Sequence, residues 1–467
     1  MIATLTFAYV LALTPGHALI ADDYAAYILH ASNLVEGRPY AEIKYIVNPQ
    51  AIWIGPVEGY PPVFPALLAP VYKLFGMNFW AMKIVTVLCF TIFLIVLVRL
   101  AEPILPLWGR IALILLVGLH PVFREYGNYV MSEIPYAMFS FAALWTIDVS
   151  YRDLRANDWH LREALLTAAL IYLSYGTRTI GATLLPALAL VDLCRFKRPS
   201  RFLLVVLFTA GVLIALQVSL LTAPKTYVRL TGFSAAGVHR NFLFYGKVLS
   251  YVWANGWSKK IQIVVAALAT CIAAAGFLRI FRQRKSATEF YLLAYVVTLL
   301  FYTFEFGLRA LLPILPLYFL YFLAGSARLA GRFRAPARAA LVTSLAFGVA
   351  FTYIGSFQTG WRIKTGPDIR DAPFRQLCAF IKQSTAPSDV VAFDKPRSIT
   401  LFTNRRSTAL AGDETPAQLS RFVNEAHIAI LVIPDWQPPY LDQFAVTHGK
   451  LIYRNAEYTV FQISGTY

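Results

Sequence analysis

The stretch ADDYAAYILHASNLVEGRPY, residues 21–40, carries the features from which the rest of the chain can be interpreted. It follows an apolar run, residues 2–20, which predicts a membrane helix at the start of the chain. The stretch itself has the pattern of an amphipathic helix, so we expect it to lie on the membrane surface. Asp22 and Asp23 would then lie where the chain leaves the bilayer, a place where a carboxylate is costly unless it has a partner or a task.

A secretory signal is the alternative interpretation of the first apolar run. Such signals begin with basic residues and end at a small-residue cleavage site. This run has no basic start and leads directly into Asp22 and Asp23, so we expect a helix that is retained. The acidic pair has two open interpretations, because carboxylates at a helix N-terminus can cap the free amides of that helix or serve in a reaction.

Composition places the whole chain in a membrane. Of its 467 residues, 58% are hydrophobic and 14% are charged, whereas about a quarter of the residues of a soluble protein are charged. The net charge of +17 comes from short basic clusters between apolar runs. Contact with anionic lipid headgroups and the topology of the membrane helices explain such clusters better than nucleic-acid binding does. The four cysteines lack CxxC spacing and imply neither zinc nor a disulfide framework.

Apolar runs of sufficient length predict about eleven membrane helices. They cover residues 2–20, 79–98, 107–123, 130–149, 163–177, 178–194, 202–222, 261–281, 288–307, 309–326 and 339–357. With this count, every second connection carries a basic cluster, and all clusters face the same side. The positive-inside rule makes that side the cytoplasm, which places the N-terminus inside and the C-terminus outside.

The outer side would then hold three long segments: residues 21–78, residues 223–260 and everything after about residue 358. The first segment contains Glu58 and Tyr60, followed by two prolines and a short apolar helix that we expect in the interface. The last segment changes composition and alternates helix and strand signals. We therefore expect a transmembrane domain over residues 1–357 and a small outer α/β domain over residues 358–467.

The predicted outer domain begins with a helix from Asp371 to Ser384, because Pro373 follows the capping Asp371. A second helix fits residues 415–426. Val390–Phe393 and Ile428–Ile433 have the pattern of buried strands, and Lys450–Ile463 that of a hairpin.

Other polar residues lie near the predicted outer surface. The turn HPVFREYGNYVMSEIPY, residues 120–136, contains Arg124, Glu125 and Glu133. Arg124 and Glu125 fit either a solvated surface pair or a site. Glu133 precedes an apolar helix, and we expect it to reach below the surface, either as a cap or as a functional group.

Two arginines follow at the outer ends of predicted helices: Arg178 in SYGTRTIGATLLP, residues 174–186, and Arg309 in EFGLRALLPILPL, residues 305–317. Each side chain could extend to the headgroups. A guanidinium also binds phosphate in bidentate fashion, so the two could form a phosphate site beside the carboxylates. The i, i+4 spacing suggests Glu305 as the counter-ion of Arg309.

These segments resemble the GT-C superfamily of integral-membrane glycosyltransferases, in particular bacterial members similar to the aminoarabinose transferase, the protein O-mannosyltransferases and the RgtA/B/C/D-like group. The matching pieces, between residues 20 and 320, are DDYAAYILHASNLVEGRPY, YPPVFPALLAPVYKLFG, SEIPY, TRTIG and RALLPILPL. Each is degenerate alone, and their order and topology carry the resemblance. It implies a polytopic α-helical fold of GT-C type.

The resemblance also implies roles for residues. The catalytic base, or the group that orients the acceptor, falls on Asp22 with Asp23 as its neighbour. The second acid would be Glu133 or Glu125, and Arg178 and Arg309 would bind phosphate. We add Glu58, Tyr60, Arg124 and Glu125 as candidate substrate-binding residues. The family often has Asp-Glu where this chain has Asp-Asp, which leaves open which carboxylate is the base.

The reaction that the resemblance implies is inverting transfer from a polyprenyl-phosphate sugar donor to a lipid, glycan or protein acceptor, at the outer face of a bacterial inner membrane. A carboxylate would deprotonate the acceptor while arginines stabilise the leaving phosphate. The carrier phosphate already activates the sugar, so no cofactor is required. A divalent metal on Asp22, Asp23 and Glu133 is compatible with their oxygen ligands.

Two other classes remain as alternatives. A transporter or flippase would show internal repeats and charges at mid-membrane, neither of which the sequence displays. An O-antigen polymerase or ligase would have a large late outer loop with basic motifs, for which segment 223–260 is the candidate. The chain contains no HExxH, GxSxG or P-loop pattern, so hydrolase and nucleotide-driven chemistry have no support.

Overall fold

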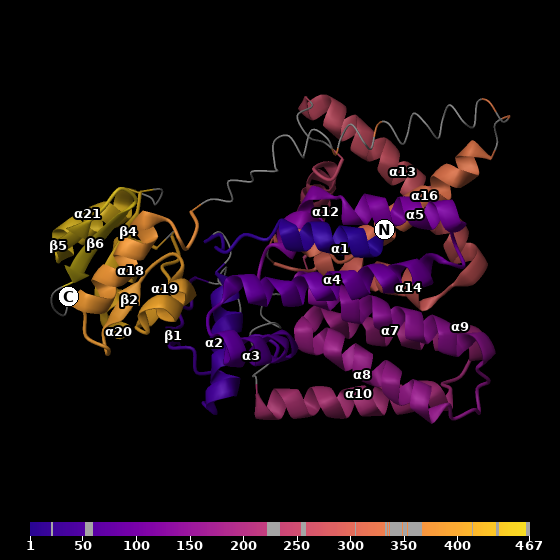
Figure 1. Cartoon of the computed structure of the whole chain (residues 1–467), viewed down its shortest axis with the longest axis horizontal. Helices are drawn as coiled ribbons and strands as arrows, with labels where there is room; N and C mark the ends of the chain where they lie inside the picture. Colours follow the sequence, from indigo (N-terminus) through magenta and orange to yellow (C-terminus); the bar gives the residue numbers. More distant parts are fainter. Residues whose placement is uncertain are drawn as a thin grey trace.

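The computed structural model of the chain describes residues 1–19, 22–51, 59–221, 234–253, 258–303, 305–331, 367–412, 414–435 and 439–463, and the single residues 334, 336, 348 and 353. These residues form a helical bundle with an α/β unit at one end (Figure 1). Two helices, α2 (Asp23–Glu36) and α3 (Val63–Phe75), lie at that end of the bundle.

The bundle is built from helices of very different length. They are α1 (Ile2–Leu11), α4 (Phe79–Ala101), α5 (Leu107–Gly118), α6 (Pro121–Gly127), α7 (Glu133–Asp153), α8 (Leu161–Thr177), the 3-10 helix η2 (Thr179–Thr183), α9 (Leu184–Phe196), α10 (Arg201–Leu220), α12 (Ala235–Ser250), α13 (Lys259–Arg284), α14 (Ala287–Leu300), α15 (Leu308–Leu311) and α16 (Leu315–Ala330).

Polar residues fix where several bundle helices begin. The Asn78 side chain accepts a hydrogen bond from the amide of Ala81 at the start of α4. The Ser200 side chain does the same for Leu203 at the start of α10. The Glu289 side chain accepts a hydrogen bond from the amide of Ser286 at the start of α14 (2.8 Å). Each cap satisfies amides that have no partner within the helix, so the apolar run begins directly after the polar residue.

Four segments of the described chain are long and apolar enough to cross a membrane: α4, Thr179–Phe196, α10 and α13. Helices α5 and α6, bent by 58° against each other, could form one more, broken span. Large apolar side chains such as Phe208 on α10 and Leu268 on α13 are exposed, as expected of a lipid-facing surface. The number of about eleven spans stays a prediction.

Some predicted spans differ from the helices observed. Helix α1 ends at Leu11 and not near residue 20, because Pro15 and Gly16 disfavour its continuation. The predicted span 107–123 breaks before Pro121. Most of the predicted span 339–357, residue Glu58, and residues 223–233 and 254–257 of the predicted outer loop lie outside the described residues.

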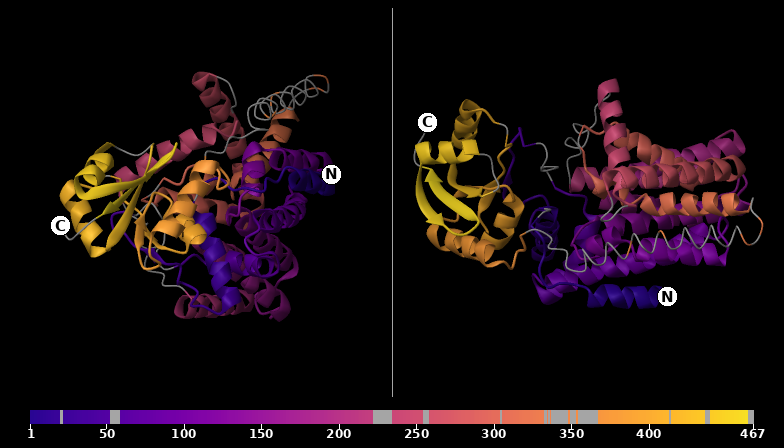
Figure 2. Two further views of the ribbon diagram at one scale, coloured as in Figure 1. Left: turned by 60° about the vertical axis from the view of Figure 1, so that its left-hand side comes forward. Right: turned by 90° about the horizontal axis from the view of Figure 1, so that it is seen from above.

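Helix α13 runs obliquely to the other long helices (Figures 1 and 2). It packs closely against α16 at two glycines, Gly276 and Gly325. A Cβ atom at Gly276 would meet the carbonyl oxygen of Tyr321 and lie 2.8 Å from the amide nitrogen of Gly325, and one at Gly325 would meet the carbonyl oxygen of Ile272. Only glycine therefore allows these two backbones to approach so closely.

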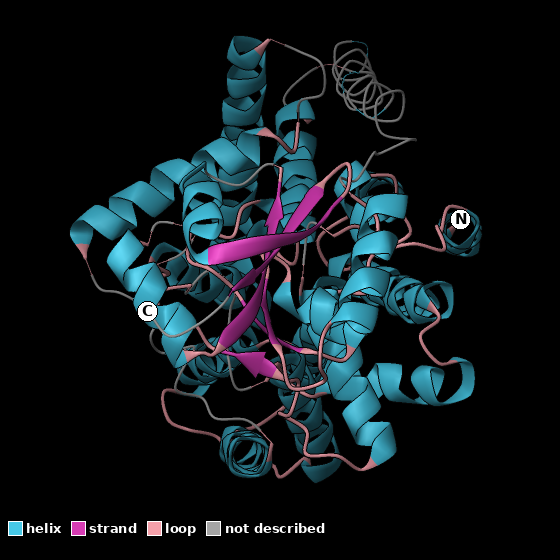
Figure 3. Ribbon diagram, turned by 90° about the vertical axis from the view of Figure 1, so that its left-hand side faces the viewer, coloured by secondary structure: helices cyan, strands magenta, loops and turns pink. Residues whose placement is uncertain are grey.

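The α/β unit contains a six-stranded sheet in the order β1-β3-β2-β4-β6-β5 (Figure 3). The four strands from β1 to β4 pair in parallel, and β6 pairs antiparallel with both β4 and β5. The strands are β1 (Tyr45–Ile46), β2 (Val390–Ala392), β3 (Arg406–Thr408), β4 (Ile428–Pro434), β5 (Gly449–Arg454) and β6 (Tyr458–Ile463), and the helices are α18 (Ala372–Ser384), α19 (Pro396–Thr403), α20 (Pro416–Glu425) and α21 (Pro439–His448).

Alternation along the strands gives the sheet two apolar faces. Val391 and Val432 pack with α18 and α19 in a core that continues to Tyr24 and Ile28 of α2. Val390 and Leu431 face the other way, into a core with α20 and α21. One apolar core therefore joins the α/β unit to the membrane-proximal helices.

The first outer segment also contributes directly to this sheet. Strand β1 pairs with β3, with Tyr45 opposite Ser407 and Ile46 opposite Thr408. The α/β unit thus includes residues from both ends of the chain. The predicted domain boundary near residue 358 separates segments of sequence that fold as one sheet.

Candidate active site

Asp22 lies at the start of α2, and its side chain binds α19 of the α/β unit. Its Oδ2 atom accepts a hydrogen bond from the amide of Arg397 (2.9 Å). Its Oδ1 atom accepts from the amide of Ser398 (2.8 Å) and from Ser398 Oγ (2.6 Å). Of the two interpretations left open for the acidic pair, capping of its own helix does not apply to Asp22, which makes no side-chain cap bond to α2 and instead accepts from free amides of α19.

Asp23 faces the arginines. Arg309 Nη1 lies 2.5 Å from its Oδ2 atom. Its Oδ1 atom accepts from Tyr60 Oη at 2.5 Å and lies 3.4 Å from Arg397 Nη1. Two guanidinium groups and a phenol thus hold one carboxylate, with an arginine from the membrane bundle on one oxygen and an arginine from the α/β unit on the other.

Glu133, the first residue of α7, is fully buried beneath this pair. Its Oε1 atom accepts from Arg178 Nη1 (2.7 Å) and from Arg309 Nε. Its Oε2 atom is buried and has no hydrogen-bond partner among the described residues. Arg309 therefore bridges Asp23 and Glu133, and Arg178 is the second cation on Glu133.

The cluster gathers most of the residues that the sequence predicted: Asp22, Asp23, Tyr60, Glu133, Arg178 and Arg309. Arg178 is brought in because α8 ends at Thr177 and the chain turns through extended backbone into η2. Arg309 is brought in by α15, which begins after Gly307 at a φ of +63°. That break explains why Glu305 is not its counter-ion: Glu305 lies before the helix and pairs with Arg240 at 3.7 Å.

Arg124 and Glu125 lie elsewhere. They line a separate cavity of about 260 Å³ with Tyr9, Asn128 and Arg370. Glu125 accepts a hydrogen bond from Tyr129 Oη at 3.0 Å. Of the two candidates for the second acid, Glu133 shares Arg309 with Asp23, whereas Glu125 lines this other cavity. A role of Arg124 and Glu125 in substrate binding stays a prediction. Glu58 lies outside the described residues.

The two adjacent aspartates have different electrostatic environments. Burial raises the pKa of Asp22 above its usual range, although Arg397 and the hydrogen bonds from α19 oppose that rise. Burial acts in the same direction on Asp23, but the charges of Arg309 and Arg397 outweigh it and lower the pKa to about 2. Asp22 is therefore the stronger base of the two.

The three carboxylates do not form a metal site in the described part of the chain, where no three His, Cys, Asp or Glu side chains group as ligands. Asp22 is turned towards α19, whereas Asp23 and Glu133 are each held by arginines. The guanidinium of Arg309 occupies the position between Asp23 and Glu133, and metal ligation by these carboxylates stays a prediction.

Sequence reasoning missed Arg397 and Ser398, which follow Pro396 in the segment DKPRS. Arg397 is fully buried, donates to Tyr60 Oη at 3.0 Å and lies over the rings of Tyr45 and Tyr60. A proline that opens a helix was the one available signal. It indicates a helix N-terminus but not that Asp22, far away in the sequence, would reach it.

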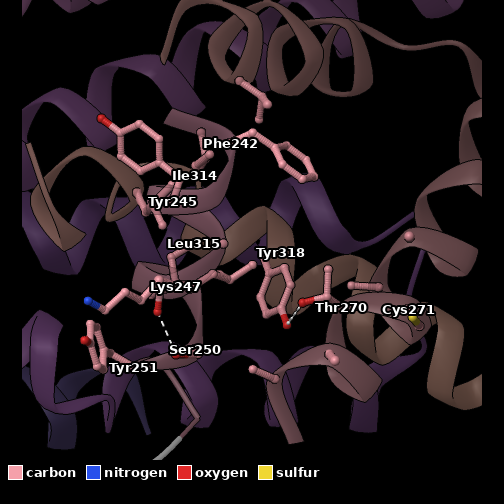
Figure 4. Close-up of a pocket in the computed structure, with 18 of the residues that line it drawn as sticks. Phe242, Tyr245, Lys247, Ser250, Tyr251, Thr270, Cys271, Ile314, Leu315 and Tyr318 are labelled. Atoms are coloured by element: carbon pink, nitrogen blue, oxygen red, sulfur yellow. Dashed lines mark hydrogen bonds between the residues drawn. The ribbon is translucent and has the colours of Figure 1, made fainter. Parts of the chain in front are cut away.

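A large apolar cavity borders α15 at Leu311. It has a volume of about 970 Å³ and is lined by α12, α13, α14 and α16 (Figure 4). Phe242, Tyr245, Leu315 and Tyr318 point into it, and Leu311 of α15 contributes to its wall. Among its described lining residues the charged ones are Lys247 and Lys259.

The helical bundle, with its cluster of acids and arginines at the end that carries the α/β unit, is similar in fold to GT-C glycosyltransferases of known structure. Residues 60–223 match the family model described as dolichyl-phosphate-mannose-protein mannosyltransferase. No curated protein matches the chain by sequence.

The chain also shares its fold with solved members of this class. ArnT from Cupriavidus metallidurans, solved with undecaprenyl phosphate, is 11% identical with a TM-score of 0.58, covering 98% of this chain and 96% of ArnT. The Archaeoglobus fulgidus oligosaccharyltransferase tethered to an acceptor peptide is 11% identical with a TM-score of 0.62, covering 99% and 74%. The oligosaccharyltransferase AglB from Archaeoglobus fulgidus, in complex with an inhibitory peptide and a dolichol-phosphate, gives a TM-score of 0.60 at 12% identity, covering 99% of this chain and 74% of AglB. The resemblance to GT-C proteins is thereby confirmed at the level of the fold.

Proposed function

We propose that this protein transfers a sugar from a polyprenyl-phosphate donor to a lipid, glycan or protein acceptor at the outer face of a bacterial inner membrane. One observation carries the proposal. Arg309 and Arg178, two cations suited to a phosphate, lie against Asp23 and Glu133 beside a third carboxylate, Asp22, which is more basic than Asp23. Relatives of this fold were solved with undecaprenyl phosphate and with a dolichol-phosphate, which supports the donor class.

The proposed step is an inverting displacement. The acceptor hydroxyl or amine attacks the anomeric carbon, and the bond from that carbon to the phosphate oxygen breaks with its electron pair leaving on the phosphate. Asp22 takes the acceptor proton, because a base works best when its pKa approaches the working pH and Asp22 is the stronger base of the two. Arg309 and Arg178 stabilise the charge that develops on the leaving phosphate.

The cavity beside α15 offers a place for the donor's prenyl chain. Arg309 and Leu311 belong to the same short helix, so the phosphate site and the apolar cavity share a wall. A volume of about 970 Å³ with an apolar lining suits several isoprene units. Lys247 and Lys259 add positive charge for the phosphate end of an incoming lipid.

The test is an in vitro transfer assay with the purified full chain in lipid nanodiscs. A panel of radiolabelled polyprenyl-phosphate sugars is offered, and release of polyprenyl phosphate is measured. Asp22→Asn with Asp23→Asn should abolish release and leave the protein folded. Glu36→Gln, an exposed carboxylate on the same helix, is the matched control and should retain activity. Full activity of the double variant would overturn the proposed site.

Mass spectrometry of copurifying lipids gives an independent measurement. A polyprenyl phospho-sugar bound to the native chain would support the donor class and name the sugar. If only ordinary phospholipids copurify, and no polyprenyl phosphate is released from any donor in the panel, the result would instead support the transporter alternative.

A further inference from the structure

Helix α19 holds the proposed base with three donors. The amides of Arg397 and Ser398 and the hydroxyl of Ser398 all bind the Asp22 carboxylate, at 2.9, 2.8 and 2.6 Å. Asp22 and Ser398 are 376 positions apart in the chain. We propose that α19 of the α/β unit is part of the catalytic centre, with Ser398 and Arg397 as positioning residues that fix Asp22 and Asp23 for sugar transfer. This inference rests on the proposed function.

Ser398 is itself fixed in orientation. It is fully buried, and its Oγ atom lies 2.9 Å from Tyr24 Oη. A serine hydroxyl has a single hydrogen, which it uses towards Asp22, so Tyr24 is the donor in the second bond. Tyr24 stands two residues after Asp22 on the same polypeptide, and this closes a small ring of hydrogen bonds between α2 and α19.

Arg397 links α19 to Asp23 as well as to Asp22. Its amide binds Asp22, and its guanidinium donates to Tyr60 and lies 3.4 Å from Asp23. Arg397 of the α/β unit therefore contacts both Asp22 and Asp23. If the α/β unit moved away, both carboxylates and Tyr60 would lose this partner together.

The hydrogen bonds from α19 leave one acceptor position of the Asp22 carboxylate unused. A carboxylate has about four acceptor positions, and the bonds from α19 occupy two on Oδ1 and one on Oδ2. The position left on Oδ2 can accept the proton of the sugar acceptor. The donors from α19 therefore orient the base without blocking it.

The pH dependence of transfer distinguishes this role from a structural one. The charged or titratable groups that interact with Asp22 are Arg397 on α19, Tyr24 on α2 and Tyr45 on β1, with Asp23 adjacent. Ser398 and Arg397 both lower the pKa of Asp22 against the effect of burial. Loss of either raises that pKa, and since the base must be ionised, the acidic limb of kcat/KM must move to higher pH.

The experiment measures kcat, donor KM and the pH profile of the full chain in nanodiscs for four variants. Ser398→Ala should move the acidic limb upward by about one pH unit, the shift expected from losing one hydrogen bond to a charged carboxylate. Its kcat should fall about tenfold, with the donor KM unchanged within about twofold. Ser398→Thr keeps the hydroxyl and should restore the native profile.

Arg397→Gln and Arg421→Gln form a matched pair of variants in the α/β unit. Arg397→Gln should shift the acidic limb of the kcat/KM profile in the same direction as Ser398→Ala. Arg421 is exposed on α20, where it pairs with Glu425, so Arg421→Gln should keep the native profile. If Arg397→Gln fails to fold, Ser398→Ala still decides the matter.

Two results would overturn different claims. A native enzyme that transfers sugar, with a Ser398→Ala variant of unchanged kcat and unchanged acidic limb, removes α19 from the catalytic centre and leaves the proposed function standing. A native enzyme that transfers no sugar from any donor removes the proposed function and this inference with it.

Discussion

Glu133 shows how much the site depends on single buried charges. Its side chain is fully buried and serves two arginines through one oxygen. Arg178 and Arg309 would otherwise hold two positive charges against Asp23 alone. Breaking a buried ion pair by removing one partner costs about 3–5 kcal/mol, because the other charge stays behind without compensation.

Glu133→Gln should therefore lower stability and abolish transfer. We expect a loss of about 3 kcal/mol, since the amide keeps one hydrogen bond but no charge. Glu305→Gln is the matched control, because its pair with Arg240 is exposed and such pairs contribute about 0–1 kcal/mol. Thermal unfolding in detergent compares the two variants with the native chain. Equal unfolding midpoints for the two variants would show that the charge of Glu133 does not stabilise the cluster.

At the scale of elements, local sequence signals were informative where a helix or strand is set by its own residues. The predicted helix from Asp371 corresponds to α18, the helix over 415–426 to α20, and the hairpin to β5 and β6. Capping residues, prolines and alternation act within a few positions, so they can be read from the chain. The early end of α1 also has a local signal, Pro15 and Gly16, which the prediction of a helix up to residue 20 did not take into account.

Helix α13 offers a test of the cavity at this scale. Ala267 and Ala275 are both exposed on α13, and only Ala267 lines the cavity. Ala267→Phe should fill part of the space for a prenyl chain and raise the donor KM several-fold, with a smaller effect on kcat. Ala275→Phe adds the same ring to the same helix outside the cavity and should change neither value. A donor KM that is equal in the two variants would place the lipid elsewhere.

At the scale of the whole molecule, the site is assembled from segments that the sequence keeps far apart. The grouping of Asp22, Asp23, Glu133, Arg178 and Arg309 was predicted from their common place at the outer surface, together with the family resemblance. The contact of Asp22 with α19 and the pairing of β1 with β3 could not be predicted, because no local pattern encodes a contact over more than 350 positions. Such contacts form because they are buried together when the chain folds, and burial cannot be read from the neighbouring sequence.

The orientation of the chain in the membrane is a prediction at the scale of the whole molecule. Arg152, Arg155 and Arg162 flank the connection between α7 and α8, at the opposite end of α7 from Glu133, so the positive-inside rule predicts that the α/β unit lies outside. Single cysteines at Gln383 on α18 and at Asp153 at the end of α7, both exposed, test this in a background without the four native cysteines. A membrane-impermeant maleimide applied to intact spheroplasts should label position 383 and not 153, and lysed cells should show label at both. The reverse pattern would place the α/β unit in the cytoplasm, where an outer-face transferase could not have its site.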